Sequence, residues 1–266
     1  MARYKRFVAI GDSSVEGLND LYPDGHSYRG WSDRLAERLA ELEPDLLYAN
    51  LAVRGRLVGE VRAQQLEPAL AMHPDLVVVV AGLNDILRPR CDVQRVIDDL
   101  EAIYSAFAQS GAQLLAYTMP SRSAAMMTLR SAELKIDRYN EGLRMLADNY
   151  GAVLVDFAHE DFSPDSRLWS SDRLHANSAG HALIADALAQ ALDLPGSDGS
   201  WRQPIPLGHP LRRHQIVARE IHWAAAYMAP WIVRRLRGRS SGDGVVAKRP
   251  VLTPAIGYVQ SGDADR

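Results

Sequence analysis

Short apolar runs recur along the first 195 residues of the chain, and longer stretches of mixed polarity separate them. The runs are rich in Val, Leu and Ala and nearly free of alternation, which is typical of strands that a parallel sheet buries on both faces. Five strands are predicted on this basis: Phe7–Ile10, Leu46–Leu51, Leu76–Ala81, Leu114–Thr118 and Val153–Phe157.

Between these runs the apolar residues recur at steps of three or four, the spacing that places side chains on one face of a helix. Four helices are predicted: Ser27–Leu42, Val93–Ser110, Leu134–Tyr150 and Ser178–Leu194. Strands that alternate with helices indicate an α/β fold. Because crossovers are right-handed, the simplest topology is a three-layer α/β/α sandwich with a five-stranded parallel sheet.

The pattern changes after about residue 195. Residues 195–210 are rich in Pro and Gly, which predicts a connector. A helix is expected over roughly Leu211–Ala229, ended or kinked by Pro230, and an extended, partly disordered tail is expected from Gly238 onward. The chain is thus divided into an α/β domain, residues 1–195, and a C-terminal helical extension, residues 196–266, made of connector, helix and flexible tail.

Charge is distributed unevenly between these two parts. The whole chain has a formal net charge of -3, but residues 201–240 contain eight arginines and a single acidic residue, Glu220. The α/β domain is therefore acidic, and no nucleic-acid partner is expected. The helix within residues 211–237 is basic and amphipathic, so we expect it to contact an anionic membrane surface or to dock on its own domain or a second subunit. The sequence leaves these alternatives and the oligomeric state open.

The sequence predicts neither secretion nor a membrane span. The apolar stretch near the N-terminus is only Phe7–Ile10, which is too short for a signal peptide, and no run reaches about 18 apolar residues. Cys91 is the only cysteine, so an intramolecular disulfide is excluded, as fits a reducing compartment. We expect a cytoplasmic protein, with a membrane-peripheral location as the alternative.

Candidate chemistry lies where the predicted strands end, the edge at which open α/β sheets bind ligands. Ser13 follows the first strand in a Gly-Asp-Ser turn, and Asp172 and His175 follow the fifth. A serine hydroxyl becomes a nucleophile when a histidine takes its proton, and a carboxylate orients that histidine. Residues three apart in a helical turn lie on one side, so Asp172 and His175 are expected to face one site.

Donors for a developing oxyanion are available at the same edge. The backbone N–H of Ser13, the N–H of Gly55 and the side-chain amide of Asn84 are expected to form an oxyanion hole. Asp12 and Asp85 are interpreted as supporting the reacting groups rather than reacting themselves. The histidines outside the site show no zinc-ligand spacing, and neither a metal nor an organic cofactor is expected.

Four short blocks in this order resemble those of the SGNH (GDSL) hydrolase family. The blocks are Phe7–Gly17 with Ser13, Asn50–Gly55, Gly82–Asp85 with Asn84, and Asp172–His175 followed by Gly180 and His181. The resemblance implies a flavodoxin-like sheet, a serine esterase or lipase without cofactor, Ser13 as nucleophile, and Asp172 and His175 as acid and base. Ser14 and Val15 after the nucleophile, and Ala52 in the second block, depart from the residues that the family often has at these places. Neither change removes a reacting group.

These features predict a hydrolase of carboxylic esters or thioesters that acts through an acyl-enzyme on Ser13. Short-chain or lipid-derived small-molecule esters are the first expectation. Two alternatives stay open: a carbohydrate O-deacetylase of the same fold, and a catalytically silent relative that only binds a ligand. The loop Leu18–Arg29 is expected to border the site and to help select the substrate.

Overall fold

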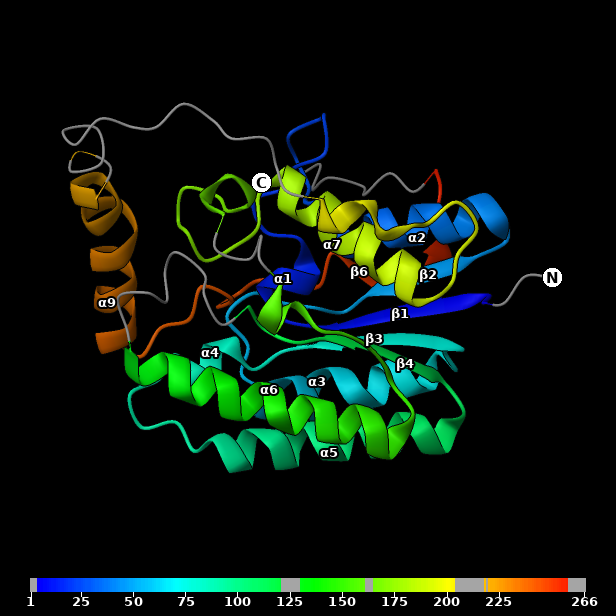
Figure 1. Cartoon of the computed structure of the whole chain (residues 1–266), viewed down its shortest axis with the longest axis horizontal. Coiled ribbons are helices and arrows are strands. Elements are labelled where there is room, and N and C mark those ends of the chain that lie inside the picture. Colours follow the sequence, from blue (N-terminus) through cyan, green and yellow to red (C-terminus); the bar gives the residue numbers. More distant parts are fainter. Residues whose placement is uncertain (1–3, 121–129, 161–164, 204–217, 219, 258–266) are drawn as a thin grey trace.

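The computed structural model describes residues 4–120, 130–160, 165–203, 218 and 220–257. Its centre is a six-stranded sheet in the order β5-β4-β3-β1-β2-β6, with helices on both faces (Figure 1). The strands are β1 Arg6–Gly11, β2 Leu47–Asn50, β3 Leu76–Val80, β4 Gln113–Tyr117, β5 Val153–Val155 and β6 Arg249–Pro254. Strands β1 to β5 pair in parallel, so the predicted three-layer sandwich with its parallel strands is confirmed.

The sixth strand differs from the sequence prediction. Strand β6 pairs antiparallel with β2, and Leu47 lies opposite Pro254. It comes from the segment that was expected to be a flexible tail, so that expectation is wrong for Arg249–Pro254. An edge strand needs no continuous apolar run, and it tolerates proline because one row of its backbone groups faces away from the sheet.

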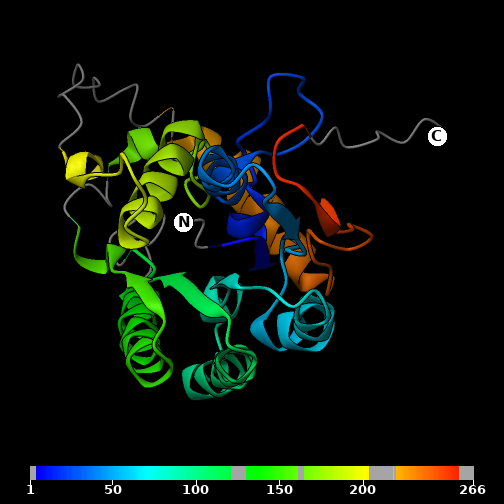
Figure 2. The ribbon, with the colours of Figure 1, turned by 90° about the vertical axis from the view of Figure 1, so that its right-hand side faces the viewer.

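Two layers of helices enclose the sheet (Figures 1 and 2). Helices α2 (Gly30–Leu42) and α7 (Ser178–Ala191) pack together on one face. The other face carries α3 (Val58–Ala71), α5 (Val93–Ser110) and α6 (Arg130–Tyr150). The short helices are α1 Ser13–Glu16, α4 Leu83–Ile86, η2 Phe157–His159, η3 Ser166–Leu168 and η4 Gly199–Arg202. All four predicted helices are present, with ends that differ by a few residues.

Helix α3 has no counterpart in the sequence prediction. A buried polar residue, Gln65, interrupts its apolar face, and Pro68 lies within it. The Gln65 side chain accepts from the Gly11 N–H at 2.8 Å and donates to the Gly11 carbonyl at 2.9 Å. The residue that weakens the helical pattern therefore satisfies the backbone at the end of β1, because buried polar groups need partners.

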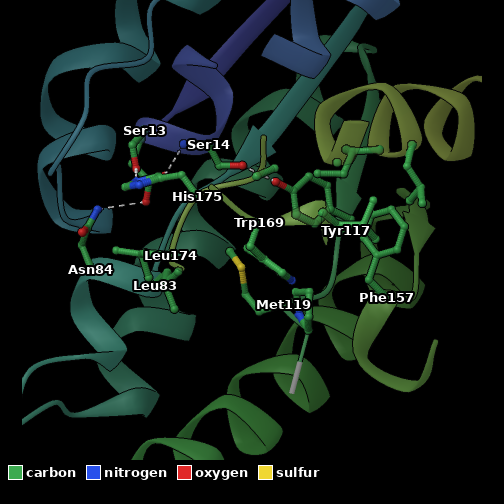
Figure 3. Close-up of a pocket in the computed structure, with 17 residues that line it drawn as sticks. Ser13, Ser14, Leu83, Asn84, Tyr117, Met119, Phe157, Trp169, Leu174 and His175 are labelled. Atoms are coloured by element: carbon green, nitrogen blue, oxygen red, sulfur yellow. Dashed lines mark hydrogen bonds between the residues drawn. The ribbon is translucent and has the colours of Figure 1, made fainter. Parts of the chain in front are cut away.

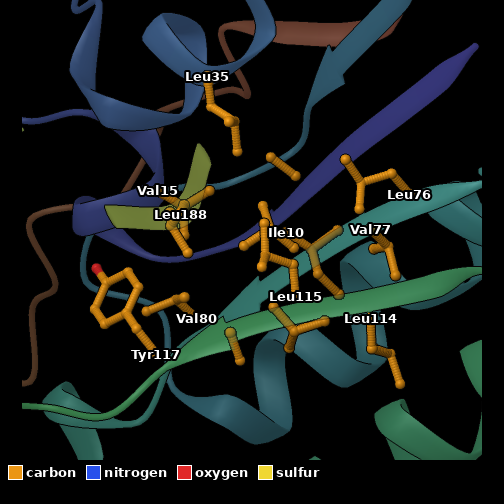
Figure 4. Packing of buried hydrophobic residues seen from close by; sticks show 14 of the residues in the cluster. Ile10, Val15, Leu35, Leu76, Val77, Val80, Leu114, Leu115, Tyr117 and Leu188 are labelled. Atoms are coloured by element: carbon orange, nitrogen blue, oxygen red, sulfur yellow. The ribbon is translucent and has the colours of Figure 1, made fainter. Parts of the chain in front are cut away.

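A continuous core holds the strand ends in place. All five residues of β3 are buried. Ile10 of β1 lies in the same cluster, together with Leu115 of β4 (Figure 4). On one face of the sheet, Val15 and Leu188 bring α1 and α7 into the same cluster. Packing of this density leaves little freedom at the carboxyl ends of β1 and β3.

Gly11 allows the chain to leave β1 and enter α1. Its φ is 151°, and a Cβ at this position would collide with the Val80 carbonyl oxygen of the neighbouring strand. Any other residue would therefore push β1 away from β3 or change the turn. The turn places Ser13 as the first residue of α1, at the carboxyl edge of the sheet.

The C-terminal helix, residues 220–236, stands beside this same edge (Figure 1). It contains a π-helical turn, η5 (Ala224–Met228), followed directly by α9 (Ala229–Leu236). Pro230 therefore does not end the helix. The wider turn comes just before the proline, whose ring and missing N–H would disturb regular α-helical bonding. The predicted part over residues 211–217 lies outside the described residues.

Candidate active site

Ser13, His175 and Asp172 form a chain of hydrogen bonds at the carboxyl edge of the sheet. The Oγ atom of Ser13 lies 2.8 Å from Nε2 of His175 (Figure 3). The Nδ1 atom of the same ring lies 2.8 Å from Oδ2 of Asp172. The fold therefore brings a serine together with two residues about 160 positions later, in the order that proton transfer from a serine requires.

The turn that carries Asp172 and His175 is not helical, although the sequence predicted a helical turn there. The carboxylate of Asp172 accepts from the backbone N–H groups of Leu174 at 2.9 Å and of His175 at 3.0 Å. Arg173 has a φ of 61°, in the left-handed region that non-glycine residues rarely adopt. The proximity of Asp172 and His175 thus comes from a tight turn that the Asp172 side chain itself closes.

Asp172 is held in its charged form. Burial alone would raise its pKa, but the hydrogen bonds from His175 and Leu174 and the charge of His175 outweigh burial and hold the pKa well below its usual range. Asn19 Nδ2 and Ser170 Oγ add hydrogen bonds to the carboxylate at 2.8 and 2.7 Å. A carboxylate with this many donors keeps a fixed orientation toward the imidazole.

The three expected oxyanion donors differ in their surroundings. Within the described residues, the N–H groups of Ser13 and Gly55 donate to no other group. The side-chain nitrogen of Asn84, labelled in Figure 3, donates to Asp12 at 3.1 Å. It also donates to the Arg56 carbonyl at 3.1 Å. Both amide hydrogens of Asn84 are therefore engaged, and donation to an oxyanion would require one of these bonds to be exchanged.

Gly55 is covered by a part of the chain far away in sequence. Its φ is 75°, and a side chain there would collide with the hydroxyls of Ser240 and Ser241. Ser240 Oγ donates to the Gly55 carbonyl at 3.3 Å. Gly242 lies so close to the Arg54 carbonyl that it too leaves no room for a Cβ. The C-terminal extension therefore shapes the loop that carries the Gly55 N–H.

Asp12 and Asp85 support the site through backbone contacts. Asp12 caps α1 by accepting from the Ser14 N–H at 3.2 Å, and Asp85 accepts from the Val58 N–H at the start of α3 at 3.1 Å. Burial raises the pKa of Asp12 to about 7 and that of Asp85 to about 6. Burial therefore favours the neutral, protonated form of both carboxyl groups.

An apolar pocket opens beside Ser13 and His175. One end is formed by these two residues with Asn84, and the other reaches Tyr117 and Phe157 (Figure 3). Most of the remaining lining is apolar: Leu83, Met119, Pro120, Leu168, Trp169, Leu174, Ala176, Leu183 and Ile184. The enclosed space is about 90 Å³. It is smaller than the ~150 Å³ cavity that holds benzene in another protein, so it has room for a short apolar group.

The loop Leu18–Arg29 does not line this pocket in the described part of the chain, contrary to expectation. It packs against α2 instead, and Tyr22 donates to Asp33 at 3.0 Å. Only its first part reaches the site, through the bond from Asn19 to Asp172. The loop therefore supports the turn that carries the acid rather than forming a wall for the substrate.

Residues 9–183 match the family model described as the GDSL-like lipase/acylhydrolase family. The chain belongs to this family. The match includes β2 to β5, the end of β1, the hydrogen-bonded Ser13, His175 and Asp172, and the first part of α7, so this GDSL-family chain is placed among the ester hydrolases. The C-terminal extension lies outside the matched residues. No curated protein matched the chain.

Solved structures share the fold of this GDSL-family chain at low sequence identity. Axe2, an acetylxylan esterase from Geobacillus stearothermophilus, is 18% identical with a TM-score of 0.60, over 75% of this chain and 100% of that one. LAE5, an α/β hydrolase enzyme from the metagenome of Lake Arreo, Spain, is 21% identical with a TM-score of 0.59, over 71% and 95% of the two chains. The acetyl xylan esterase AlAXEase is 18% identical with a TM-score of 0.56, over 70% of this chain and 99% of that one. These likenesses establish the fold.

Several residues that touch the reacting groups carry no signal in the sequence. Asn19 and Ser170 contact the Asp172 carboxylate, and Trp223 donates to the Asp172 carbonyl at 2.9 Å. Each is a common residue type in a loop or an amphipathic helix. Ser14 is a second hydroxyl in the pocket, and its Oγ lies 2.5 Å from the Tyr117 hydroxyl instead of facing His175. Only spatial neighbours distinguish these residues.

Proposed function

We propose that the chain hydrolyses carboxylic esters through an acyl-enzyme on Ser13. The observation that carries the proposal is the pair of 2.8 Å contacts linking Ser13 Oγ, the His175 ring and Asp172, at the end of an apolar pocket. Ser13 is the first residue of α1 and is only 8% exposed, so its hydroxyl is held in one place. This arrangement provides a nucleophile, a base and a group that orients the base.

The reaction would proceed in two steps. Ser13 Oγ attacks the ester carbonyl carbon while its proton passes to Nε2 of His175, and the resulting imidazolium is stabilised by Asp172. The N–H groups of Ser13 and Gly55, with Asn84 after exchange of one bond, stabilise the oxyanion. His175 then protonates the leaving alcohol. A water molecule, deprotonated by the same ring, attacks the acyl-enzyme and releases the acid and Ser13. No metal or organic cofactor enters these steps.

The lining and the volume of the pocket support a short acyl group as the part of the substrate that is enclosed. Leu83, Leu183 and Ile184 would pack against methylene groups, each of which contributes about 0.8 kcal/mol when buried. A carbohydrate O-deacetylase remains the second candidate, because the named neighbours include acetylxylan esterases. A series of p-nitrophenyl esters from acetate to octanoate, beside an acetylated xylo-oligosaccharide, separates the two. The acyl-pocket proposal expects kcat/KM to rise beyond acetate.

The decisive test replaces the nucleophile. In Ser13→Ala, kcat for p-nitrophenyl butyrate should fall by at least about 10⁴-fold, because the acyl-enzyme cannot form. Ser14→Ala is the matched control, since this hydroxyl bonds to Tyr117 and not to His175. A serine-directed fluorophosphonate should label wild type and Ser14→Ala but not Ser13→Ala. Labelling of Ser13→Ala, or no labelling of the folded wild type, would overturn the proposal; the second result would favour a silent ligand-binding protein.

A further inference from the structure

The two faces of the C-terminal helix have opposite characters. The face toward the α/β domain carries the polar contacts: Trp223 donates to the Asp172 carbonyl, and Tyr227 bonds to Ser171 with their hydroxyl oxygens 2.7 Å apart. Glu220 forms two hydrogen bonds with the Arg173 guanidinium at 2.7 and 2.8 Å. The helix thus uses its polar groups to dock on the turn that carries Asp172.

The opposite face is apolar and exposed. It is formed by Ile221, Ala225, Ala229 and Val233, which follow one another at steps of four residues. Ile221 is 65% exposed and Val233 is 43% exposed, and Met228 beside them is 40% exposed. Residues two positions away from Trp223 and Tyr227 point to the other side of a helix. A helix on a protein surface normally turns its apolar residues toward the core and its polar residues toward water.

Positive charge continues this outward face at its C-terminal end. Arg234 and Arg237 are exposed, and neither has an ion-pair partner within the described residues. No helix among the described residues is long and apolar enough to cross a membrane. A short apolar stripe that ends in free arginines fits a surface with an apolar interior and anionic headgroups, on which such a helix lies flat.

We propose that Ile221, Ala225, Ala229 and Val233 form a docking face for an anionic lipid surface, with Arg234 and Arg237 binding the headgroups. The inner face of the same helix contacts the Asp172 turn, so docking places the carboxyl edge of the sheet beside the lipid. The apolar pocket opens at that edge. The proposal concerns binding alone and does not depend on hydrolysis by Ser13.

Flotation of the full chain with vesicles tests the proposal. Wild type should float with phosphatidylcholine vesicles that contain phosphatidylglycerol, far less with phosphatidylcholine alone, and less as salt is raised. The double variant Ile221→Glu/Val233→Glu should lower the partition coefficient at least tenfold. Leu134→Glu is the matched control, because Leu134 is 75% exposed on α6 and is not part of the proposed docking face. Circular dichroism establishes that each variant is folded.

Three results would overturn the proposal. The first is that folded wild type fails to float with anionic vesicles. The second is that Ile221→Glu/Val233→Glu and Leu134→Glu float equally with wild type. The third is a wild-type dimer in sedimentation velocity that the double variant makes monomeric without any vesicle binding, which would assign the face to a second copy. Ser13→Ala should float like wild type, so a failure of the esterase proposal is distinguishable from a failure of this one.

Discussion

Two carboxyl groups near Ser13 lie in opposite electrostatic environments. Burial would raise the pKa of Asp172, but His175 and two backbone N–H groups hold it well below its usual range. Burial raises the pKa of Asp12 to about 7, and the N–H of Ser14 only partly offsets this. One carboxylate is therefore charged at all physiological pH values, and the other gains or loses a proton near neutrality.

Asp12 should make the stability of the fold fall as pH rises. Between about pH 4 and pH 7 the folded chain retains a proton at Asp12 that the unfolded chain has released, so unfolding becomes easier through this window. In Asp12→Asn this contribution is absent. The unfolding free energy of wild type relative to the variant should drop by up to about 4 kcal/mol between pH 4 and pH 8.

Urea unfolding at several pH values measures this difference. Asp45→Asn is the control, because Asp45 is exposed and lies away from the site. Its unfolding free energy should follow that of wild type at every pH. Parallel pH profiles for wild type and Asp12→Asn would contradict the raised pKa of Asp12.

The C-terminal helix and the Asp172 turn act as a connected pair of elements. Arg173, whose φ is 61°, is held by Glu220 and lies over the Trp223 ring, with its guanidinium carbon 4.9 Å from the ring centroid. Trp223 also donates to the Asp172 carbonyl. These contacts stabilise a backbone conformation that costs about 1–3 kcal/mol in isolation. The helix is thus a support for the geometry of His175.

Trp223→Phe should loosen this turn while leaving an aromatic ring over Arg173. The variant lacks the donor to the Asp172 carbonyl, a bond of about 1 kcal/mol, so kcat should fall about three- to tenfold with KM little changed. Initial rates with p-nitrophenyl butyrate measure the effect. Tyr150→Phe also removes one aromatic donor, to Glu101 far from the turn, and should keep the wild-type kcat. A wild-type kcat in Trp223→Phe would mean that the turn holds its conformation without the helix.

The extension beyond α7 wraps around the molecule. The C-terminal helix stands at the carboxyl edge, Ser240 lies on Gly55, and β6 closes the edge of the sheet beside β2 (Figure 1). Between them, Lys248 inserts its ammonium group under the loop before α2, where it pairs with Asp33 at 2.8 Å. The Lys248 and Asp33 side chains are 10% and 4% exposed. The described segments of the extension are therefore part of the folded domain.

Loss of this buried ion pair should lower the unfolding free energy of the whole chain. Lys248→Met removes the charge that neutralises Asp33, so the unfolding free energy should fall by about 3–5 kcal/mol. Arg38→Met is the matched control, since Arg38 and Asp186 form a pair in which the side chains are 28% and 53% exposed. Its effect should stay below about 1 kcal/mol. Guanidinium chloride unfolding measures both. Equal effects would show that the extension adds nothing specific to stability.

The sequence was sufficient where the physical signal is local. Continuous apolar runs identified the parallel strands because strands buried on both faces need apolar residues throughout. The Gly-Asp-Ser turn and the Asp172–His175 block stood out because tight turns and proton transfer each demand particular residue types. The signal failed for α3, whose buried face includes Gln65, and for β6, whose two prolines and mostly unburied residues at a sheet edge resemble a tail.

The sequence by itself therefore determined the α/β class, the parallel strands and which residues have the chemistry to react. Only the tertiary structure decided that Ser13 lies within hydrogen-bond distance of His175, that Asn84 is already bonded to Asp12, and that the extension docks on the Asp172 turn. The physical reason is distance along the chain. Periodicity and turn chemistry depend on neighbours in sequence, whereas these contacts join segments that meet only when the sheet and its two helical layers pack together.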